Sequence, residues 1–136
     1  MNVTVDASVA VKWILKEEEH AGAMALLTDE VTLHAPTLLL AEVGNVIWRR
    51  ARAGRFSTAT GRTAFAKTRS AIEVFHGLDG LADTALQISL DLDHPIYDCV
   101  YLACAEREDT ALVTADRRLT NAVAGSRFSD RIELLS

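Results

Sequence analysis

Short apolar stretches alternate with helix-length segments along this chain, and the alternation limits the possible folds more than any other feature. Five stretches have the composition and length of buried β-strands: Val3–Val5, Val31–His34, Ile72–Phe75, Ala111–Thr114 and Ile132–Leu135. Strands that alternate with helices are typical of a parallel sheet with helices on both faces. Ligands of such sheets bind beyond the carboxyl ends of the strands.

The segments between these strands predict seven helices: Ser8–Leu15, Glu17–Leu27, Pro36–Ala53, Ser57–Ala71, Leu81–Leu92, Tyr97–Arg107 and Arg117–Val123. We expect Ser8 to be an N-cap and Pro36 to occupy a first helical turn. Gly54 should end the third helix, and Ser57 or Thr58 should cap the fourth. The 136 residues fit one domain, 1–136, with no linker or repeat.

Composition excludes several classes of protein. The hydrophobic fraction of 49% supports a full core, and no apolar run is long enough to span a membrane. The amino-terminal residues do not resemble a signal peptide, so we expect a cytoplasmic protein. Cys99 and Cys104 are too few for a disulfide scaffold, and we interpret them as buried, reduced thiols. No Cys/His spacing is typical of a zinc site.

The net charge of −5 hides an uneven distribution of charge. No acid lies between Val43 and Ile72, whereas seven bases do: Arg49, Arg50, Arg52, Arg55, Arg62, Lys67 and Arg69. A basic surface beside an acidic region would suit a nucleic-acid partner. The alternative is a pair of solvated helices whose arginines have no such role.

Four carboxylates stand in mainly apolar surroundings, where a solvated acid is not expected: Asp6, Glu42, Asp98 and Asp116. Buried charge is costly unless it is paired, and four neighbouring acids would repel one another. A divalent cation with oxygen ligands removes both costs. The four acids therefore predict a metal site whose ligands are scattered in sequence and convergent in space.

Each acid also has a simpler interpretation. Asp6, Asp98 and Asp116 all stand where an N-cap or first-turn Asp is favoured. Glu42 is harder to explain in this way, because its neighbours one helical turn away are apolar, although it could lie at a solvated helix edge. Asn45 lies one turn further on and could position Glu42 or a metal-bound water.

Four segments in this order resemble the PIN-domain ribonucleases, and closely resemble the VapC-type toxins of toxin–antitoxin modules. They are Val5–Ser8, Ala41–Asn45, Tyr97–Ala103 and Thr114–Leu119. No single segment is specific, but the ordered set in a chain of this length is. The resemblance implies a three-layer α/β/α sandwich with a central, mainly parallel sheet of about five strands.

The resemblance also implies an activity. It points to Mg²⁺, or Mn²⁺, held by Asp6, Glu42, Asp98 and Asp116, with Ser8 and Thr114 matching polar positions beside the acids. The expected reaction is endonucleolytic cleavage of structured RNA such as tRNA or rRNA, which inhibits translation until a VapB-like antitoxin binds. Homodimers are frequent in the family. Some members carry a further acid or Asn where Arg117 and Arg118 stand here, which leaves a second metal position open.

Arginines near the acids are the candidate RNA contacts: Arg49, Arg50, Arg52 and Arg117. Two enzyme classes on similar sheets fit less well, because a dehalogenase-type phosphatase or a receiver domain would need further acids or a late Lys that this chain lacks. The remaining alternative is a non-catalytic, or differently targeted, PIN-fold nucleic-acid-binding protein.

Overall fold

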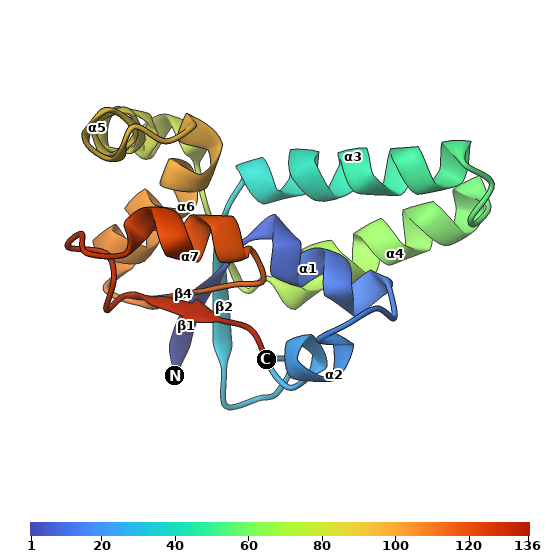
Figure 1. The fold of residues 1–136 in the computed structure, drawn as a ribbon. Coiled ribbons are helices and arrows are strands. Elements are labelled where there is room, and N and C mark those ends of the chain that lie inside the picture. The colour runs from blue at the N-terminus through green and yellow to red at the C-terminus, as the bar shows by residue number, and fades with distance from the viewer.

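The computed structural model describes residues 1–136 and has a five-stranded sheet at its centre (Figure 1). All neighbouring strands are parallel, in the order β3-β2-β1-β4-β5. The strands are β1 (Asn2–Val5), β2 (Thr32–Pro36), β3 (Val74–His76), β4 (Ala111–Thr114) and β5 (Ile132–Leu134). The predicted α/β class with five parallel strands is confirmed.

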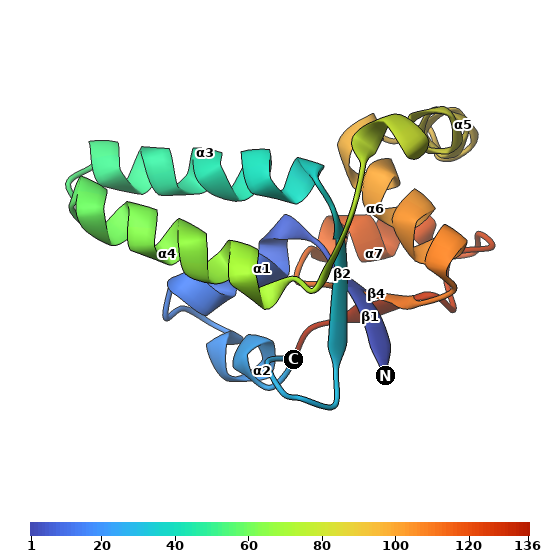
Figure 2. The ribbon, with the colours of Figure 1, turned by 180° about the vertical axis from the view of Figure 1, so that it is seen from behind.

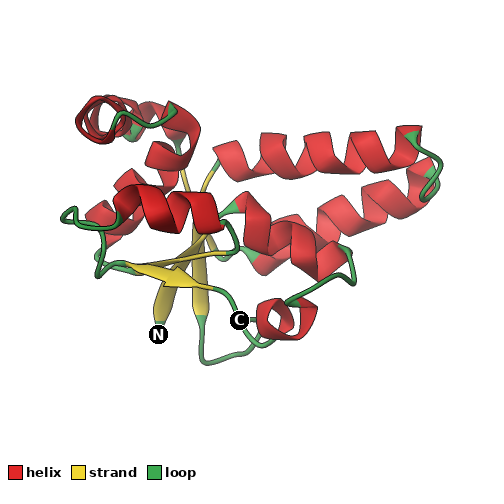
Figure 3. Cartoon of the chain, viewed as in Figure 1, coloured by secondary structure: helices red, strands yellow, loops and turns green.

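Seven α-helices form the outer layers (Figure 3). They are α1 (Ala7–Ile14), α2 (His20–Met24), α3 (Leu38–Arg52), α4 (Thr58–Ala71), α5 (Ala82–Leu92), α6 (Ile96–Glu108) and α7 (Arg117–Val123). Helices α1 to α4 lie on one side of the sheet and α5 to α7 on the other, as right-handed crossovers require (Figures 1 and 2). Helices α3 and α4 form a long hairpin that extends beyond the sheet.

Helix α6 packs against β1, β2 and β4 and is buried through its middle, from Cys99 to Ala105. This explains its nearly continuous apolar sequence, since a helix between a sheet and another helix has little solvated face. Strands β1 and β4 are neighbours in the sheet. The chain continues from β1 toward β2 and β3 on one side, and from β4 toward β5 on the other. Their carboxyl ends therefore form the crevice in which such sheets bind ligands.

Several predicted elements are confirmed at their boundaries. Strand Ala111–Thr114 and helix Arg117–Val123 have the bounds that the sequence predicted. Ser57 caps α4 by accepting a hydrogen bond from the Thr60 backbone N–H. Gly54 follows α3 with a φ of 74°, a conformation that glycine adopts without strain.

Three local predictions were wrong. Asp6, not Ser8, is the N-cap of α1, because both side chains can cap and the helix begins at Ala7. The helix expected over Glu17–Leu27 is reduced to α2, since Glu19 has a φ of 67° that interrupts any longer helix. Pro36 ends β2 opposite His76 instead of starting α3, which begins at Leu38.

Both cysteines are free and buried, as predicted. Burial raises the pKa of each thiol to about 11, so both are protonated near neutral pH. No helix has the length and apolar character that a bilayer span requires.

Candidate active site

Two of the predicted acids lie at the carboxyl ends of the two central strands. Asp6 directly follows β1, and its backbone N–H donates to the Val113 carbonyl oxygen of β4 at 3.4 Å. Asp116 follows β4 after one intervening residue. Each is also an N-cap: Asp6 Oδ1 accepts from the Val9 N–H at 3.2 Å, and Asp116 Oδ1 from the Arg118 N–H at 2.9 Å. The capping interpretation is therefore correct, and it places both carboxylates at the crevice.

Two hydroxyl side chains link Asp6 to the end of β4. Ser8 Oγ donates to Asp6 Oδ1 at 2.5 Å and accepts from the Ala115 N–H at 2.8 Å. Thr114 Oγ1 donates to Asp6 Oδ2 and accepts from the Asp116 N–H at 3.0 Å. The predicted supporting residues Ser8 and Thr114 thus bind the first acid and fix the backbone that carries the last.

Asp6 is a buried carboxylate without a cationic partner. Its side-chain partners are two hydroxyls and one backbone N–H, and the residue is only 4% exposed. Burial raises the pKa of Asp6 to about 6, although the hydrogen bonds from Ser8 and Thr114 oppose the shift. The nearby Asp98 carboxylate adds a smaller increase. The site is therefore short of positive charge.

Glu42 projects from the second turn of α3 and is half-buried. The Tyr101 hydroxyl of α6 donates a short hydrogen bond to Glu42 Oε1. Burial is the main cause that raises the pKa of Glu42, the charge of Asp98 adds to it, and the Tyr101 bond opposes it. Helices on opposite sides of the sheet thus meet at this carboxylate.

Asp98, in the first turn of α6, is hydrogen-bonded to His94. The distance from His94 Nε2 to Asp98 Oδ2 is 2.7 Å, and both side chains are partly exposed. The contacts of His94 and Tyr101 with Asp98 and Glu42 were not predicted from the sequence. Their spacing of minus four and plus three from Asp98 is the signal that would have suggested them.

Three of the four acids are coupled electrostatically. The charge of Asp98 raises the pKa of both Asp6 and Glu42, although burial is the larger cause in each case. Asp116 is connected through the hydrogen bonds of Thr114. No three of the four carboxylates bring ligand oxygens within 4.8 Å of one another; that close approach occurs elsewhere, among His34, His76 and Glu108. The four acids therefore stay apart around the crevice at the strand ends, which we call the acid pocket.

Asn45 and Arg117, two further residues predicted for the site, are both exposed. Asn45 is exposed, and its side chain makes no hydrogen bond within the chain. Arg117 is exposed at the start of α7. Its neighbour Arg118, 93% exposed, reaches Asp116 with Nε 3.7 Å from Oδ1. The Arg118 guanidinium thus lies beside the last acid, where some family members carry a further acid or Asn.

The three arginines in the last turn of α3 also differ. Arg49 is exposed. Arg50 Nη2 forms an ion pair with Glu17 Oε1 at 2.8 Å, so part of its charge is already neutralised. The Arg52 guanidinium lies over the ring of Trp48, 5.4 Å from its centroid, and Trp48 is 54% exposed. The exposed part of this basic face therefore combines cations with an aromatic ring.

The family model and the similar proteins point to the same family. Residues 3–124 match the family model of the PIN domain. VapC ribonuclease Mb0985 of Mycobacterium bovis is 34% identical over 119 residues, which cover 88% of this chain and 89% of that protein. Exonuclease VapC9 of Pyrobaculum aerophilum is 32% identical over 115 residues, covering 85% of this chain and 75% of that protein.

Solved structures share the fold. VapBC2 from Rickettsia felis, bound to a DNA fragment from its promoter, superposes with a TM-score of 0.71 at 14% identity and full coverage of both chains. PAE2754 from Pyrobaculum aerophilum superposes with a TM-score of 0.64 at 26% identity, covering 93% of this chain and 82% of that one.

Proposed function

The chain belongs to the PIN-domain family and to its VapC ribonucleases, and from this premise we propose that it is a metal-dependent endoribonuclease acting as the toxin of a toxin–antitoxin module. The observation that carries the proposal is the pocket of Asp6, Glu42 and Asp98, with Asp116 at the neighbouring strand end. A buried carboxylate without a cation and two further acids beside it suit a hydrolytic metal site.

The residues of the pocket fit Mg²⁺ or Mn²⁺. All four candidate ligands are carboxylates, which hard divalent cations prefer, and Asp6 is a buried acid for which the chain supplies no positive partner. Asp6 and Asp98 would hold the ion, with Glu42 and Asp116 acting directly or through waters. When bound, Mg²⁺ would supply Lewis-acid activation of water and stabilise charge on the scissile phosphate.

The chain's own residues prepare the site for this chemistry. Ser8 and Thr114 orient both oxygens of Asp6, which fixes the direction of its lone pairs. Tyr101 orients Glu42 and favours its ionised form, and His94 orients Asp98 through a hydrogen bond. A carboxylate with a raised pKa that contacts the ion only through water would accept a proton from the attacking water, and we assign this role to Glu42.

RNA is the substrate that the surroundings favour. The exposed end of α3 carries Arg49 and Arg52 with the Trp48 ring, a combination that binds phosphates and stacks on unpaired bases. One relative is named an exonuclease and most are named ribonucleases. A structural neighbour from Mycobacterium tuberculosis is described as a toxin that cleaves the sarcin–ricin loop. We propose single-stranded loops of structured RNA, such as tRNA or rRNA, as the target, with inhibition of translation as the result.

A VapB-like antitoxin is the proposed partner. Structural neighbours from Rickettsia felis and Haemophilus influenzae are VapBC assemblies, and another is titled a toxin–antitoxin complex. A mainly apolar cleft of about 610 Å³ lies between α1, α2 and α4, with Trp13, Met24 and Phe56 in its lining. An amphipathic antitoxin segment would fill this cleft, and an antitoxin Arg would neutralise the acids.

We also propose a homodimer in the cytoplasm. Leu86 and Leu90 on α5 are 50% and 68% exposed, and Tyr97 at the start of α6 is 61% exposed. Apolar side chains so exposed on adjacent helices suit a subunit interface. If they form it, Leu90→Glu should shift the sedimentation coefficient to that of a monomer. A wild-type monomer, or a dimer unaffected by the substitution, would contradict this interface.

The central experiment is cleavage of an RNA stem-loop labelled separately at each end. We expect internal fragments with Mg²⁺ and none with EDTA. Asp98→Asn and Glu42→Gln should lower the rate by about 100-fold or more. Asp91→Asn is the matched control, because Asp91 is exposed on α5 and its carboxylate bonds only to Gln87.

The same assay separates the alternatives. Fragments that shorten from one end only would indicate an exonuclease. RNA binding without Mg²⁺-dependent cleavage would favour a non-catalytic PIN-fold protein. Full activity in Asp98→Asn would refute the proposed pocket.

A further inference from the structure

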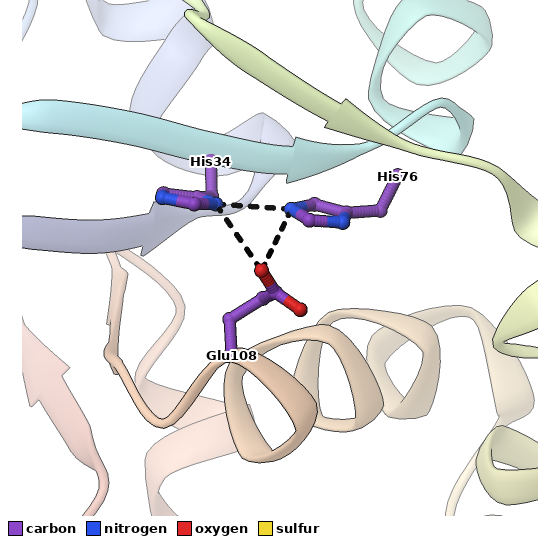
Figure 4. Close-up of side chains that lie close together, drawn as sticks. All are labelled: His34, His76 and Glu108. Carbon is purple, nitrogen blue, oxygen red and sulfur yellow. Dashed lines mark hydrogen bonds and ion pairs between the residues drawn. The ribbon is translucent and has the colours of Figure 1, made fainter.

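Two histidines and a glutamate form a second cluster of ligand atoms, away from the four acids (Figure 4). His34 comes from the middle of β2, His76 from the end of β3 and Glu108 from the last turn of α6. His34 Nδ1 and His76 Nε2 are 2.9 Å apart, and Glu108 Oε1 lies 3.9 Å and 3.6 Å from them. Figure 4 shows the two ring nitrogens facing each other, with one Glu108 carboxylate oxygen directed toward both.

This cluster is distinct from the acid pocket. Asp98 lies in the first turn of α6 and Glu108 in its last, and ten residues of α-helix span about 15 Å. The cluster also lies at the β3 edge of the sheet, whereas Asp6 and Asp116 follow the two central strands.

The hydrogen bonds around the histidines run in one direction and fix their tautomers. The Arg107 Nη2–H group can only donate, so His76 Nδ1, at 2.9 Å, is an acceptor. The proton of a neutral His76 is therefore on Nε2 and is donated to His34 Nδ1. His34 then carries its proton on Nε2 and donates it to Asn2 Oδ1 at 2.9 Å. Burial lowers the pKa of His76, which agrees with a neutral ring.

His34 is thus already arranged as a metal ligand. Its Nδ1 has a lone pair that faces the cluster, and its Nε2–H is held by a side-chain carbonyl oxygen. Histidines that bind metals usually donate the other ring N–H to an oxygen in this way. Both histidines are about 8% exposed, and their rings are stacked with planes 10° apart, so their ring positions are well constrained.

We propose that His34 Nδ1, His76 Nε2 and Glu108 Oε1 bind a divalent transition metal such as Zn²⁺. Ligand atoms about 2.0–2.1 Å from a tetrahedral zinc ion stand about 3.3–3.4 Å apart, and the three distances here are 2.9, 3.6 and 3.9 Å. A small movement of the partly exposed Glu108 side chain would shorten its two distances, and the two ring nitrogens, 2.9 Å apart, would have to separate by about 0.4–0.5 Å once they no longer share a proton. Two imidazoles and one carboxylate are a known zinc ligand set, with the fourth position open to water.

Arg107 opposes this binding. A metal on His76 Nε2 requires the ring proton on Nδ1, where it would face the N–H groups of Arg107. The arginine must therefore leave, and its side chain, 44% exposed, has room to do so. Arg107 Nη2 donates to His76 Nδ1, and Arg107 Nε lies 3.4 Å from Glu108 Oε2. The guanidinium therefore supplies the positive charge of the cluster when no metal is bound.

The bound ion would clamp the edge of the sheet. Strand β3 has only three residues, pairs with β2 alone and ends at His76. A metal shared by β2, β3 and the end of α6 would tie this short strand to both neighbours. Because the ion would bind the folded chain, it should raise the unfolding temperature in proportion to the logarithm of its concentration.

The test is a zinc titration against a chromophoric chelator, on chain freed of metal with EDTA and then held in saturating Mg²⁺ to occupy the acid pocket. We expect one Zn²⁺ per chain. His76→Gln and Glu108→Gln should each weaken binding at least tenfold. His20→Gln is the matched control and should bind as the wild type does, because His20 lies on α2 and bonds to the Lys12 carbonyl oxygen.

Arg107→Gln distinguishes a metal site from a structural hydrogen-bond network. The Gln carbonyl oxygen can accept from His76 Nδ1–H, so this variant should bind Zn²⁺ several-fold more tightly than the wild type. Unchanged zinc affinity in both His76→Gln and Glu108→Gln would overturn the proposal, as would weaker binding in Arg107→Gln. If His76→Gln does not fold, Glu108→Gln at the helix end decides the outcome through the loss of zinc-dependent thermal stabilisation.

Discussion

The Thr114 hydroxyl donates to Oδ2 of Asp6, a residue 108 positions away in the sequence. This bond joins the ends of two neighbouring strands, and the same hydroxyl accepts the backbone N–H of Asp116. Thr114 therefore lowers the pKa of the first acid and helps to fix the position of the last.

Replacing Thr114 with Val should remove both hydrogen bonds and keep the packing, because the two side chains are nearly the same size. The hydrogen bond from Thr114 lowers the pKa of Asp6, so its loss should raise that pKa further. We expect the acidic limb of the pH–rate profile to move to higher pH, with a larger loss of activity at pH 6 than at pH 8. Thr110→Val is the control, since Thr110 bonds to Thr4 at the other end of the same strand pair; it should lower stability without moving the profile.

The contribution of Asp6 to the stability of the metal-free chain should fall as pH rises. The pKa of Asp6 is 3.8 in the unfolded chain and about 6 when folded, so the folded state holds the proton more tightly. The stabilising contribution is complete below pH 3.8 and is lost as pH rises through 6, by about 3 kcal/mol at most.

Urea unfolding of wild type and Asp6→Asn across pH 4 to 8, in EDTA, measures this contribution. As pH rises, the free energy of unfolding of the wild type should fall relative to that of Asp6→Asn. Asp91→Asn should give a constant difference. A constant difference for Asp6→Asn as well would mean that Asp6 titrates at its ordinary pKa.

Tyr101→Phe tests the positioning of Glu42. The ring is buried and would remain in the core, so only the hydrogen bond is removed. Without the hydroxyl the pKa of Glu42 should rise further, and we expect about tenfold lower activity with a higher Mg²⁺ requirement. The fold should lose about 1–2 kcal/mol. Tyr97→Phe, an exposed position, should leave both unchanged; equal effects at the two tyrosines would argue against the role of the bond.

The arginines of α3 should affect RNA binding unequally. Arg49→Gln and Arg52→Gln should each lower the slope of log affinity against log salt by about 0.7, the value for one phosphate contact on a single strand. Arg50→Gln should have a smaller effect, because Arg50 already pairs with Glu17. Arg127→Gln, which breaks a pair with Glu106, should not change the slope. Equal slopes in all variants would mean that the α3 arginines are solvated and do not contact RNA phosphates.

Local sequence signals predicted the fold well where one signal acted alone. The apolar stretch ending at Thr114 and the cap at Asp116 set the bounds of β4 and α7, which the structure confirms. Alternation of strands and helices was sufficient for a parallel sheet. The prediction failed where two residues could serve the same purpose, as with Asp6 and Ser8 as caps, or where one residue suits two structures, as with Pro36.

Contacts between distant segments could not be predicted. His34 and His76 are 42 residues apart and meet because β2 and β3 pair in a register that no local pattern fixes. Tyr101 meets Glu42 only because α3 and α6 approach the same strand ends from opposite sides. Spacing rules for metal ligands apply within one element or turn, so a cluster built from three elements has no such signature in the sequence.

Because Asp6 and Asp116 each begin a helix, the choice of substitution at these two proposed metal ligands decides whether a variant loses only the charge or the helix cap as well. Alanine would remove the charge and the cap together, at a cost of about 1 kcal/mol for the cap alone. Asparagine caps a helix as well as aspartate does. Chains carrying Asn at these positions are therefore the suitable bait for isolating a bound inhibitor or trapping an uncut RNA, since their surface should remain native.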